Sequence, residues 1–470
     1  MKNSNITLLA TAAVTFACGA ATPRIEQGEL KYDVLTHKMS IDYVLVDSAA
    51  IVTFDLQTNV VENGETTAKW ASIGAENYQS ISGNFNRVVM DVGVTETISW
   101  TPYEDWPQKV KAGRLRAVVT AWSTNSPPDY CVVNINRLDT RSGTGIENRV
   151  RYYLSEKHLP YGGLDNSMYW TSNMVMRRVH AAGRTFRMGS PWTELSGRGS
   201  YNYRSPNEMA VVVTFTKDYW MAIFPMTCAQ TYYAFNSRGN HSSNGDKGPM
   251  TGHSWASFRI GLSGSANSSY NSTDYDWPNN TANPHLIGEN SYFGKMKTNT
   301  GLEFDFPTEA QWEFACRAGT DTMYYDGKKD FFAAATNDIY MAELGWFKKN
   351  CSAVQPVMGF PPNPWGFYDM HGNVYEFCLD HYPTATTAYT SSGSYNIRTP
   401  GYYIDYGGPS TGPTKDYNNV TGYYRVAKGG KYASESYACR SASRMGIGDA
   451  SLGNPGENAA RPVAALTFHW

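Results

Sequence analysis

Hydrophobic residues in the first third of the chain follow the two-residue period of β-strands. In IVTFDLQ at residues 51–57, every second residue from Val52 to Leu56 is apolar and the residues between them are polar. Further β-rich runs lie at 41–47, 88–92, 96–100 and 115–122. Short alternating runs separated by turns predict antiparallel sheets with one buried face. We therefore expect residues 28–135 to form an all-β sandwich of immunoglobulin-like or fibronectin-like character.

The pattern changes near residue 174, from where strand-like runs mix with helical ones. The run VVVTFTKDYWMAIFPMT at 211–227 is typical of a hairpin, and CAQTYYAFN at 228–236 predicts a short helix. The clearest helix is FPTEAQWEFACRAG at 306–319. There Thr308 is the expected N-cap, Gln311 occupies the capping-box position, and Gly319 ends the helix. Residues 174–470 are therefore expected to form a second domain.

Polar, irregular stretches separate and interrupt these regions. Residues 136–173 predict a linker between the two domains, partly ordered by tyrosines and tryptophan. Low-complexity runs at 263–284 and between Thr384 and Tyr417 predict surface loops.

The first 21 residues have the pattern of an export signal. Lys2 supplies the positive end, residues 6–17 are mostly apolar, and small residues follow at 19–21. Residues 1–21 are thus expected to be a signal peptide of a secreted or cell-surface protein. Cys18 leaves a second possibility open, a lipid-modified cysteine, in which case the protein would be held at a membrane.

The amino-acid composition of the chain limits the classes of partner that it is expected to bind. Charged residues make up only 17% of the chain, its formal net charge is −2, and it has no long run of Lys or Arg. A nucleic-acid partner is therefore not expected, nor an anionic membrane surface. Six cysteines follow the signal without a CxxC pair, so disulfides and small buried thiols remain equal alternatives.

The most informative stretch is NPWGFYDMHGNVYEFCLDHY at 363–382. It surrounds a short polar loop with aromatic residues. Gly372 and Asn373 tolerate the positive φ angles that such a turn needs. Asp369 and Glu376 supply oxygen ligands on either side, which suits a hard cation. The alternative is that these two carboxylates cap turns by accepting backbone N–H groups.

Five segments resemble, in order, the formylglycine-generating enzyme (sulfatase-modifying factor) family, over the C-terminal two-thirds of the chain. They are FRMGS, PTEAQWEFACRAGT, NPWGFYDMHGNVYEFCLDHY, RVAKGGKY and YACRSASR. The resemblance implies an α+β, C-type-lectin-like domain with little regular secondary structure. It also implies a calcium site formed by Asp369, Gly372, Val374 and Glu376.

Active members of that family oxidise a sulfatase cysteine to formylglycine and hold Cu(I) between two cysteines five positions apart. The resemblance places the second cysteine at Cys439 and the first at Ser434. It also places an active-site serine at Lys431 and an active-site tryptophan at Tyr375. Cu(I) is a soft ion that needs thiolate ligands, so these departures predict a degenerate site, and copper binding is not expected.

Three functions follow from the sequence. The first is an exported, non-catalytic binding or display module with an unknown protein or glycan ligand. The second is an enzyme, either a copper-dependent formylglycine-generating oxidase acting on sulfatase cysteines or an iron oxidase; no HxxxH or HxxH pair supports the iron site. The third is a binding protein whose segment 432–461 varies between alleles.

Overall fold

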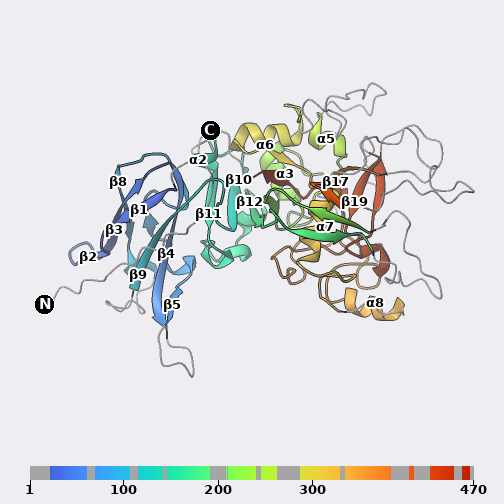
Figure 1. Cartoon of the computed structure of the whole chain (residues 1–470), viewed down its shortest axis with the longest axis horizontal. Coiled ribbons are helices and arrows are strands. Elements are labelled where there is room, and N and C mark those ends of the chain that lie inside the picture. The colour runs from blue at the N-terminus through green and yellow to red at the C-terminus, as the bar shows by residue number, and fades with distance from the viewer. Residues whose placement is uncertain are drawn as a thin grey trace, which may run out of the picture. The chain divides into compact units, whose positions relative to one another are not determined.

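The structure is a computed structural model, and it describes residues 22–60, 69–105, 115–140, 145–190, 208, 210–239, 245–261, 286–328, 334–382, 402–406, 424–448 and 458–465. The expected signal peptide at 1–21, the loop at 263–284 and nearly all of the loop from Thr384 to Tyr417 lie outside these residues. The described residues divide into two units (Figure 1). The first unit holds those of 1–134 and 142–169, and the second those of 135–141 and 170–465.

The first unit is built mainly of strands. These are β1 (Arg24–Gln27), β2 (Lys31–Asp33), β3 (Lys38–Val46), β4 (Ala50–Val60), β5 (Lys69–Ser72), β6 (Ile81–Ser82), β7 (Arg87–Val89), β8 (Thr95–Trp100), β9 (Leu115–Trp122), β10 (Tyr130–Asn134) and β11 (Val150–Tyr153). Its short helices are α1 (Pro102–Asp105), α2 (Ile146–Arg149), η1 (Ala75–Asn77), η2 (Glu156–His158) and η3 (Gly163–Asp165), and η4 (Ser167–Trp170) ends at the division between the units.

Two antiparallel sheets of the first unit share one core. One sheet has the order β1-β3-β8-β6, with β2 also on β3, and the other has β5-β4-β7, with β9 also on β4. Residues from both sheets, among them Ile41, Leu45, Phe54 and Val119, belong to a single buried cluster. The structure thus confirms a β-rich N-terminal region, and its alternating strands bury one face as the sequence pattern predicts.

The polar face of β4 is buried as well, which the alternation alone does not predict. Asp55 is only 2% exposed and accepts a hydrogen bond from Ser72. His158 of η2 lies 3.2 Å from the same carboxylate, between Nε2 and Oδ1. The segment 145–169, part of the predicted linker, therefore packs on β4 as a structural part of the first unit.

The second unit mixes strands with several helices. Its strands are β12 (Asn173–Val179), β13 (Thr185–Met188), β14 (Val211–Thr214), β15 (Tyr219–Ala222), β16 (Phe304–Asp305), β17 (Tyr375–His381), β18 (Tyr402–Ile404), β19 (Tyr424–Lys428), β20 (Met445–Gly448), β21 (Asn458–Ala459) and β22 (Val463–Ala465). Its helices are α3 (Cys228–Phe235), α5 (Trp255–Arg259), α6 (Tyr292–Thr300), α7 (Glu309–Arg317), α8 (Ala334–Met341) and η7 (Ser436–Cys439).

The strands of the second unit form three small sheets, and this arrangement corrects one expectation. Within this unit the strand orders are β12-β15-β22-β16, β13-β14-β18 and β20-β19-β17-β21. The predicted hairpin at 211–227 is wrong, because β14 pairs with β13 and β18 whereas β15 pairs with β12 and β22. The two strands have the right local pattern but join different sheets.

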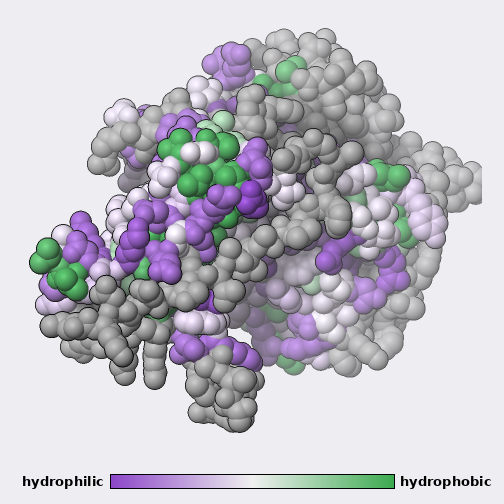
Figure 2. Space-filling view, turned by 60° about the vertical axis from the view of Figure 1, so that its left-hand side comes forward, coloured by the Kyte–Doolittle hydropathy of each residue, from purple (hydrophilic) through white to green (hydrophobic). Residues whose placement is uncertain are grey.

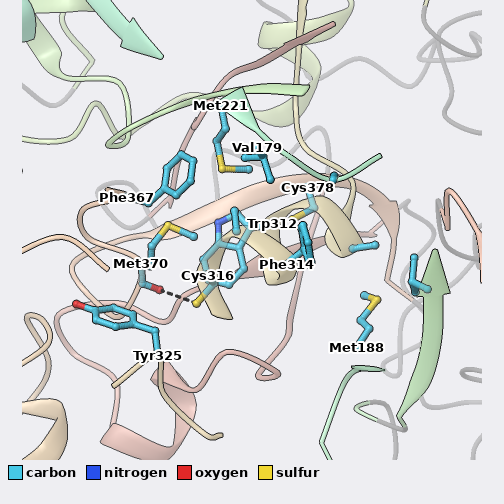
Figure 3. Close-up of a cluster of buried hydrophobic side chains, with 14 of the residues drawn as sticks. Val179, Met188, Met221, Trp312, Phe314, Cys316, Tyr325, Phe367, Met370 and Cys378 are labelled. Atoms are coloured by element: carbon cyan, nitrogen blue, oxygen red, sulfur yellow. Dashed lines mark hydrogen bonds between the residues drawn. The ribbon is translucent and has the colours of Figure 1, made fainter. Parts of the chain in front are cut away.

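Helix α7 lies in the main core and confirms its predicted N-terminal capping signals, but it closes at Ala318, one residue before the predicted Gly319. Thr308 and Gln311 form a reciprocal capping box, and Ala318 closes the helix in the left-handed conformation. Trp312, Phe314 and Cys316 of this helix pack in the buried cluster that Figure 3 shows. Helix α3 begins in the same way, at a capping box between Thr227 and Gln230.

Apolar side chains are exposed at several places in the described part of the chain. Figure 2 shows them, in that view, as separate small groups among hydrophilic ones. Within the described ranges, the helices are all too short or too polar to cross a bilayer.

Candidate functional site

The loop 363–373 is anchored on the C-terminal end of α7. The Asn363 amide donates to the carbonyls of Ala315 and Cys316, at 2.8 and 3.2 Å, and so satisfies helix carbonyls that have no partner within the helix. The side-chain oxygen Oδ1 of Asn363 accepts the backbone N–H groups of Trp365 and Phe367. One asparagine therefore fixes both the helix end and the start of the loop.

The polar centre of this loop needs left-handed backbone, as its sequence predicts. The φ angles are +55° at Asp369, +82° at Gly372 and +66° at Asn373. Gly372 also lies very close to another backbone segment, because a Cβ atom there would lie 2.0 Å from the carbonyl oxygen of Trp346. Glycine is thus required at 372 for both conformation and space.

Backbone hydrogen bonds join this loop to two other segments. Gly372 N donates to Gly429 O at 2.7 Å, and Tyr432 N donates to Asn373 O at 2.8 Å. On the other side, Asn373 N donates to Trp346 O at 2.8 Å. Backbone hydrogen bonds therefore hold the loop, the 429–434 turn and the chain around Trp346 together as one cluster.

Three of the four predicted active-site positions, Tyr375, Ser434 and Lys431, meet in this cluster. The hydroxyls of Tyr375 and Ser434 lie 3.4 Å apart. Ser434 Oγ also accepts the backbone N–H of Lys431 at 3.1 Å, and Ser434 is only 7% exposed. The serine hydroxyl is therefore held by a tight turn and a tyrosine.

The fourth position, Cys439, lies next to them but its thiol is buried. A Cβ atom at Gly430 would come within 2.6 Å of Cys439 Sγ, so the thiol packs directly against the 429–434 turn. Sγ contacts the carbonyl oxygen of Glu435 at 3.7 Å. Burial raises the pKa of the Cys439 thiol well above its ordinary value, so it stays protonated at neutral pH.

His371 fixes the backbone of Cys439. Its Nδ1 lies 2.8 Å from the Cys439 carbonyl, which can only accept, so Nδ1 carries the proton. Its Nε2 accepts the backbone N–H of Tyr325, and the ring stacks on Tyr325 with centroids 4.8 Å apart. Burial lowers the pKa of His371 to about 3, so the imidazole is neutral and acts in positioning.

A buried group of charges lies beneath the site, between α7 and β19. Lys428 Nζ lies 3.0 Å from Glu313 and 3.5 Å from Glu309. Arg444 pairs with Glu309, and Arg317 pairs with Glu313. Each carboxylate thus contacts two cations, and these ion pairs tie the helix to the strand.

Glu376 lies at the start of β17 and is fully buried with Arg461. The guanidinium donates to both carboxylate oxygens, with Nε and Nη2 each 2.7 Å away. The Trp312 indole N–H donates to Glu376 Oε2 at 2.6 Å. Arg461 also donates to the carbonyl of Tyr368 in the loop. The pair therefore joins β17, α7 and the loop.

Sequence comparison identifies this assembly. The profile of the FGE-sulfatase family, described as a sulfatase-modifying factor enzyme 1-like domain, matches residues 171–454. The chain belongs to this family. The match covers the site and confirms the resemblance that the five sequence segments carry.

Named relatives share parts of this sulfatase-modifying-factor domain. The serine/threonine-protein kinase pkn1 of Chlamydia pneumoniae is 38% identical over 76 residues, 16% of this chain and 10% of the kinase. The formylglycine-generating enzyme of Thermomonospora curvata is 30% identical over 141 residues, 28% of this chain and 40% of the enzyme. The inactive C-alpha-formylglycine-generating enzyme 2 of Bos taurus is 38% identical over 86 residues, 17% of this chain and 27% of that protein.

The chain thus spans less than half the length of each of these relatives. Among solved structures, Treponema denticola variable protein 1 aligns with 62% of this chain and 95% of its own, at 18% identity and a TM-score of 0.39.

The residues that the family resemblance assigns to calcium do not fit that ion as they are arranged here. Both oxygens of Glu376 are taken by Arg461 and Trp312, and a guanidinium repels a cation. Asp369 Oδ2 accepts the N–H of Met358, and the Gly372 carbonyl accepts the N–H of Val374. Within the described part of the chain, no three His, Cys, Asp or Glu side chains are grouped as a metal site requires. Calcium binding stays a prediction for measurement.

Several important residues escape the sequence reasoning. Arg461 lies outside the five segments that carry the family resemblance, and nothing local pairs it with Glu376. Cys316 is buried with Sγ facing the Met370 carbonyl (Figure 3). No sequence pattern singles out Cys351 as a site residue, yet its Sγ lies 3.9 Å from the Tyr432 carbonyl oxygen. All six described cysteines are free thiols.

Replacing Asp369 by asparagine is expected to stabilise the second unit at pH 7. Burial raises the pKa of Asp369 to about 6, against about 3.9 in an unfolded chain. The folded state then binds more protons between these values, so stability falls as pH rises from about 4 to 6. Asparagine tolerates the φ of +55° and removes a cost of at most about 3 kcal/mol.

Denaturant unfolding at pH 5 and pH 7 measures this effect. The difference between the variant and the wild type should be larger at pH 7. A variant that is less stable than the wild type at pH 7, specifically when calcium is added, would contradict this expectation and support a calcium site at Asp369.

Proposed function

We propose that this chain is a non-catalytic, exported member of the sulfatase-modifying factor family that serves as a binding or display module. The observation that carries the proposal is the hydrogen-bonded Ser434 hydroxyl at the position where the family resemblance expects the first thiol. Its partners are the Lys431 N–H and the Tyr375 hydroxyl, 3.1 and 3.4 Å away. Each of these three side chains departs from the pattern of the active enzymes.

The chemistry of the site supports this proposal. The Cu(I) chemistry of the active enzymes needs two thiolates. Here one position offers a serine hydroxyl, a hard and poorly ionised ligand, and the other offers a buried thiol whose pKa is raised. The side chains present therefore do not fit the copper ion, and no reaction step follows from them.

The relatives and the construction of the domain also favour a binding role. Two relatives, from Bos taurus and Mus musculus, are named as inactive formylglycine-generating enzymes. Backbone hydrogen bonds and buried charges hold the site rigid without supplying a nucleophile or an open acid–base pair. We propose a C-type-lectin-like architecture for the second unit. We also propose that the first unit is an immunoglobulin-like sandwich that serves as a spacer. Export through residues 1–21 completes the proposal.

The alternative, a copper-dependent formylglycine-generating oxidase, makes a different prediction. Wild-type protein supplied with Cu(I) and oxygen is expected to leave the cysteine of a sulfatase-motif peptide unchanged. The reason is that Ser434 replaces one of the two thiolates that the copper ion needs. Mass spectrometry of the peptide, with an aldehyde-reactive hydrazide as a second readout, measures the conversion. An aldehyde formed at that cysteine would overturn the non-catalytic proposal.

The Ser434→Cys variant separates a missing ligand from a collapsed site. The variant is expected to gain Cu(I) affinity by orders of magnitude in competition with a chromogenic chelator, because it restores a second thiol near Cys439. Ser443→Cys, which adds a thiol outside the site, is the matched control and should show no gain. Equal affinities for the two variants would mean that the site has lost more than one ligand.

A further inference from the structure

The β13-β14-β18 sheet has one buried and one exposed face. Phe186, Val213 and Tyr403 share a row, and they pack on the inner side against the core of the second unit. Because side chains alternate along a strand, the outer side carries the residues between them. Two rows cross it, Arg187–Val212–Tyr402 and Thr185–Thr214–Ile404.

The two rows combine apolar and hydrogen-bonding groups. Tyr402 is 88% exposed and Ile404 is 73% exposed, so the edge strand β18 offers an aromatic ring beside an aliphatic group. The Thr185 and Thr214 hydroxyls lie 2.7 Å apart and keep further donor and acceptor capacity. Arg187 lies 3.5 Å from Asp321, and both are largely exposed.

The edge strand that carries the ring is held firmly. β18 pairs in parallel with β14, and the next residue, Asp405, donates its N–H to the Thr214 carbonyl at 2.9 Å. The Asp405 carboxylate accepts the Thr216 N–H at 2.9 Å, and Tyr403 packs edge-on against Tyr406 beneath the sheet. The backbone that carries Tyr402 is thus fixed before any ligand arrives, which lowers the cost of binding.

The size of this face limits what can bind it. Three strands about 4.8 Å apart and two rows about 7 Å apart define a flat patch of roughly 10 by 7 Å. A stable protein interface needs about 800 Å² on each partner, far more than this patch supplies. One ring and one aliphatic group are also too few to hold a bilayer. A small ligand with apolar and hydroxyl faces matches it.

We propose that the outer face of β13-β14-β18 binds a neutral oligosaccharide. One pyranose ring would stack its weakly positive C–H groups on the negative face of the Tyr402 ring. Hydroxyls of the next sugar residue would bond to Arg187, Asp321 and the Thr185 hydroxyl, because β13 lies two strands away from Tyr402. This proposal rests on the proposed binding role and names its ligand class, on a sheet that includes neither Tyr375 nor the turn with Ser434.

An array of immobilised neutral hexose and N-acetylhexosamine oligosaccharides tests the proposal with the full chain. The wild type is expected to retain at least one of them, and Tyr402→Ala should weaken that binding by roughly tenfold or more. Tyr402→Trp should keep it. Tyr103→Ala, at a tyrosine that is 73% exposed in the first unit, is the matched control and should leave it unchanged.

Two results would overturn the proposal: no oligosaccharide retained by the wild type, or equal retention by the wild type and Tyr402→Ala. Thr185→Val provides a second variant on the same face, expected to weaken binding without touching the ring. The comparison of the wild type with Tyr402→Ala and Thr185→Val reports on this face, whereas the peptide-oxidation assay reports on the non-catalytic role, so the two proposals can fail separately.

Discussion

Replacing Glu376 by glutamine is expected to lower the free energy of unfolding of the second unit by about 3–5 kcal/mol. The variant keeps the shape of the side chain but leaves the fully buried Arg461 guanidinium without the carboxylate that it contacts directly. A buried unpaired cation is among the most costly defects that a single substitution can introduce. Denaturant unfolding of the wild type and the variant measures the loss.

Glu303→Gln is the matched control, because the Lys297–Glu303 pair is exposed and its removal should cost under about 1 kcal/mol. Arg461→Met combined with Glu376→Gln should recover part of the loss, since it removes the orphaned charge. Both variants are measured with calcium and with a chelator. A loss that appears only in calcium would show that Glu376 binds the ion and would contradict the ion-pair explanation.

Gly372→Ala is expected to destabilise the second unit by several kcal/mol or to prevent its folding. A Cβ atom at this position would meet the Trp346 carbonyl oxygen at 2.0 Å, and that oxygen belongs to backbone already bonded to Asn373. The φ of +82° adds a conformational cost of about 1–2 kcal/mol for alanine. Thermal unfolding and the yield of folded protein measure the outcome.

Gly319→Ala separates the two costs. Gly319 has a similar φ of +94°, but a Cβ atom there would have no heavy atom within 4 Å. This variant should therefore lose only the conformational term, about 1–2 kcal/mol. Similar losses at the two positions would show that the close approach at Gly372 relaxes without cost.

The structure shows which features of the chain are encoded locally. The capping box at Thr308 and Gln311, the end of α7 and the positive φ angles at Gly372 and Asn373 all follow from a few neighbouring residues. Such signals can be interpreted without knowing the rest of the fold. The family resemblance is equally local, since it rests on short ordered segments.

The features that the sequence did not reveal depend on partners far along the chain. Alternation predicts that β14 is a strand but does not say that it pairs with β18 rather than with β15. Glu309 and Glu313 look like exposed helix residues until Lys428 arrives from β19. In the same way, no residue near Glu376 in the sequence shows that Arg461 contacts both of its oxygens. Whether a charged residue is buried in the core can be predicted only once its counter-ion is known.

The position of β22 has a consequence for how the second unit folds. This strand, Val463–Ala465, lies between β15 and β16, although β15 ends at Ala222. During synthesis the central sheet cannot close until almost the whole domain has left the ribosome. Long sequence separation between paired strands also slows folding, because the loop entropy is lost before the contacts form. Chains interrupted before β22 should therefore expose the edges of β15 and β16 and be prone to aggregation.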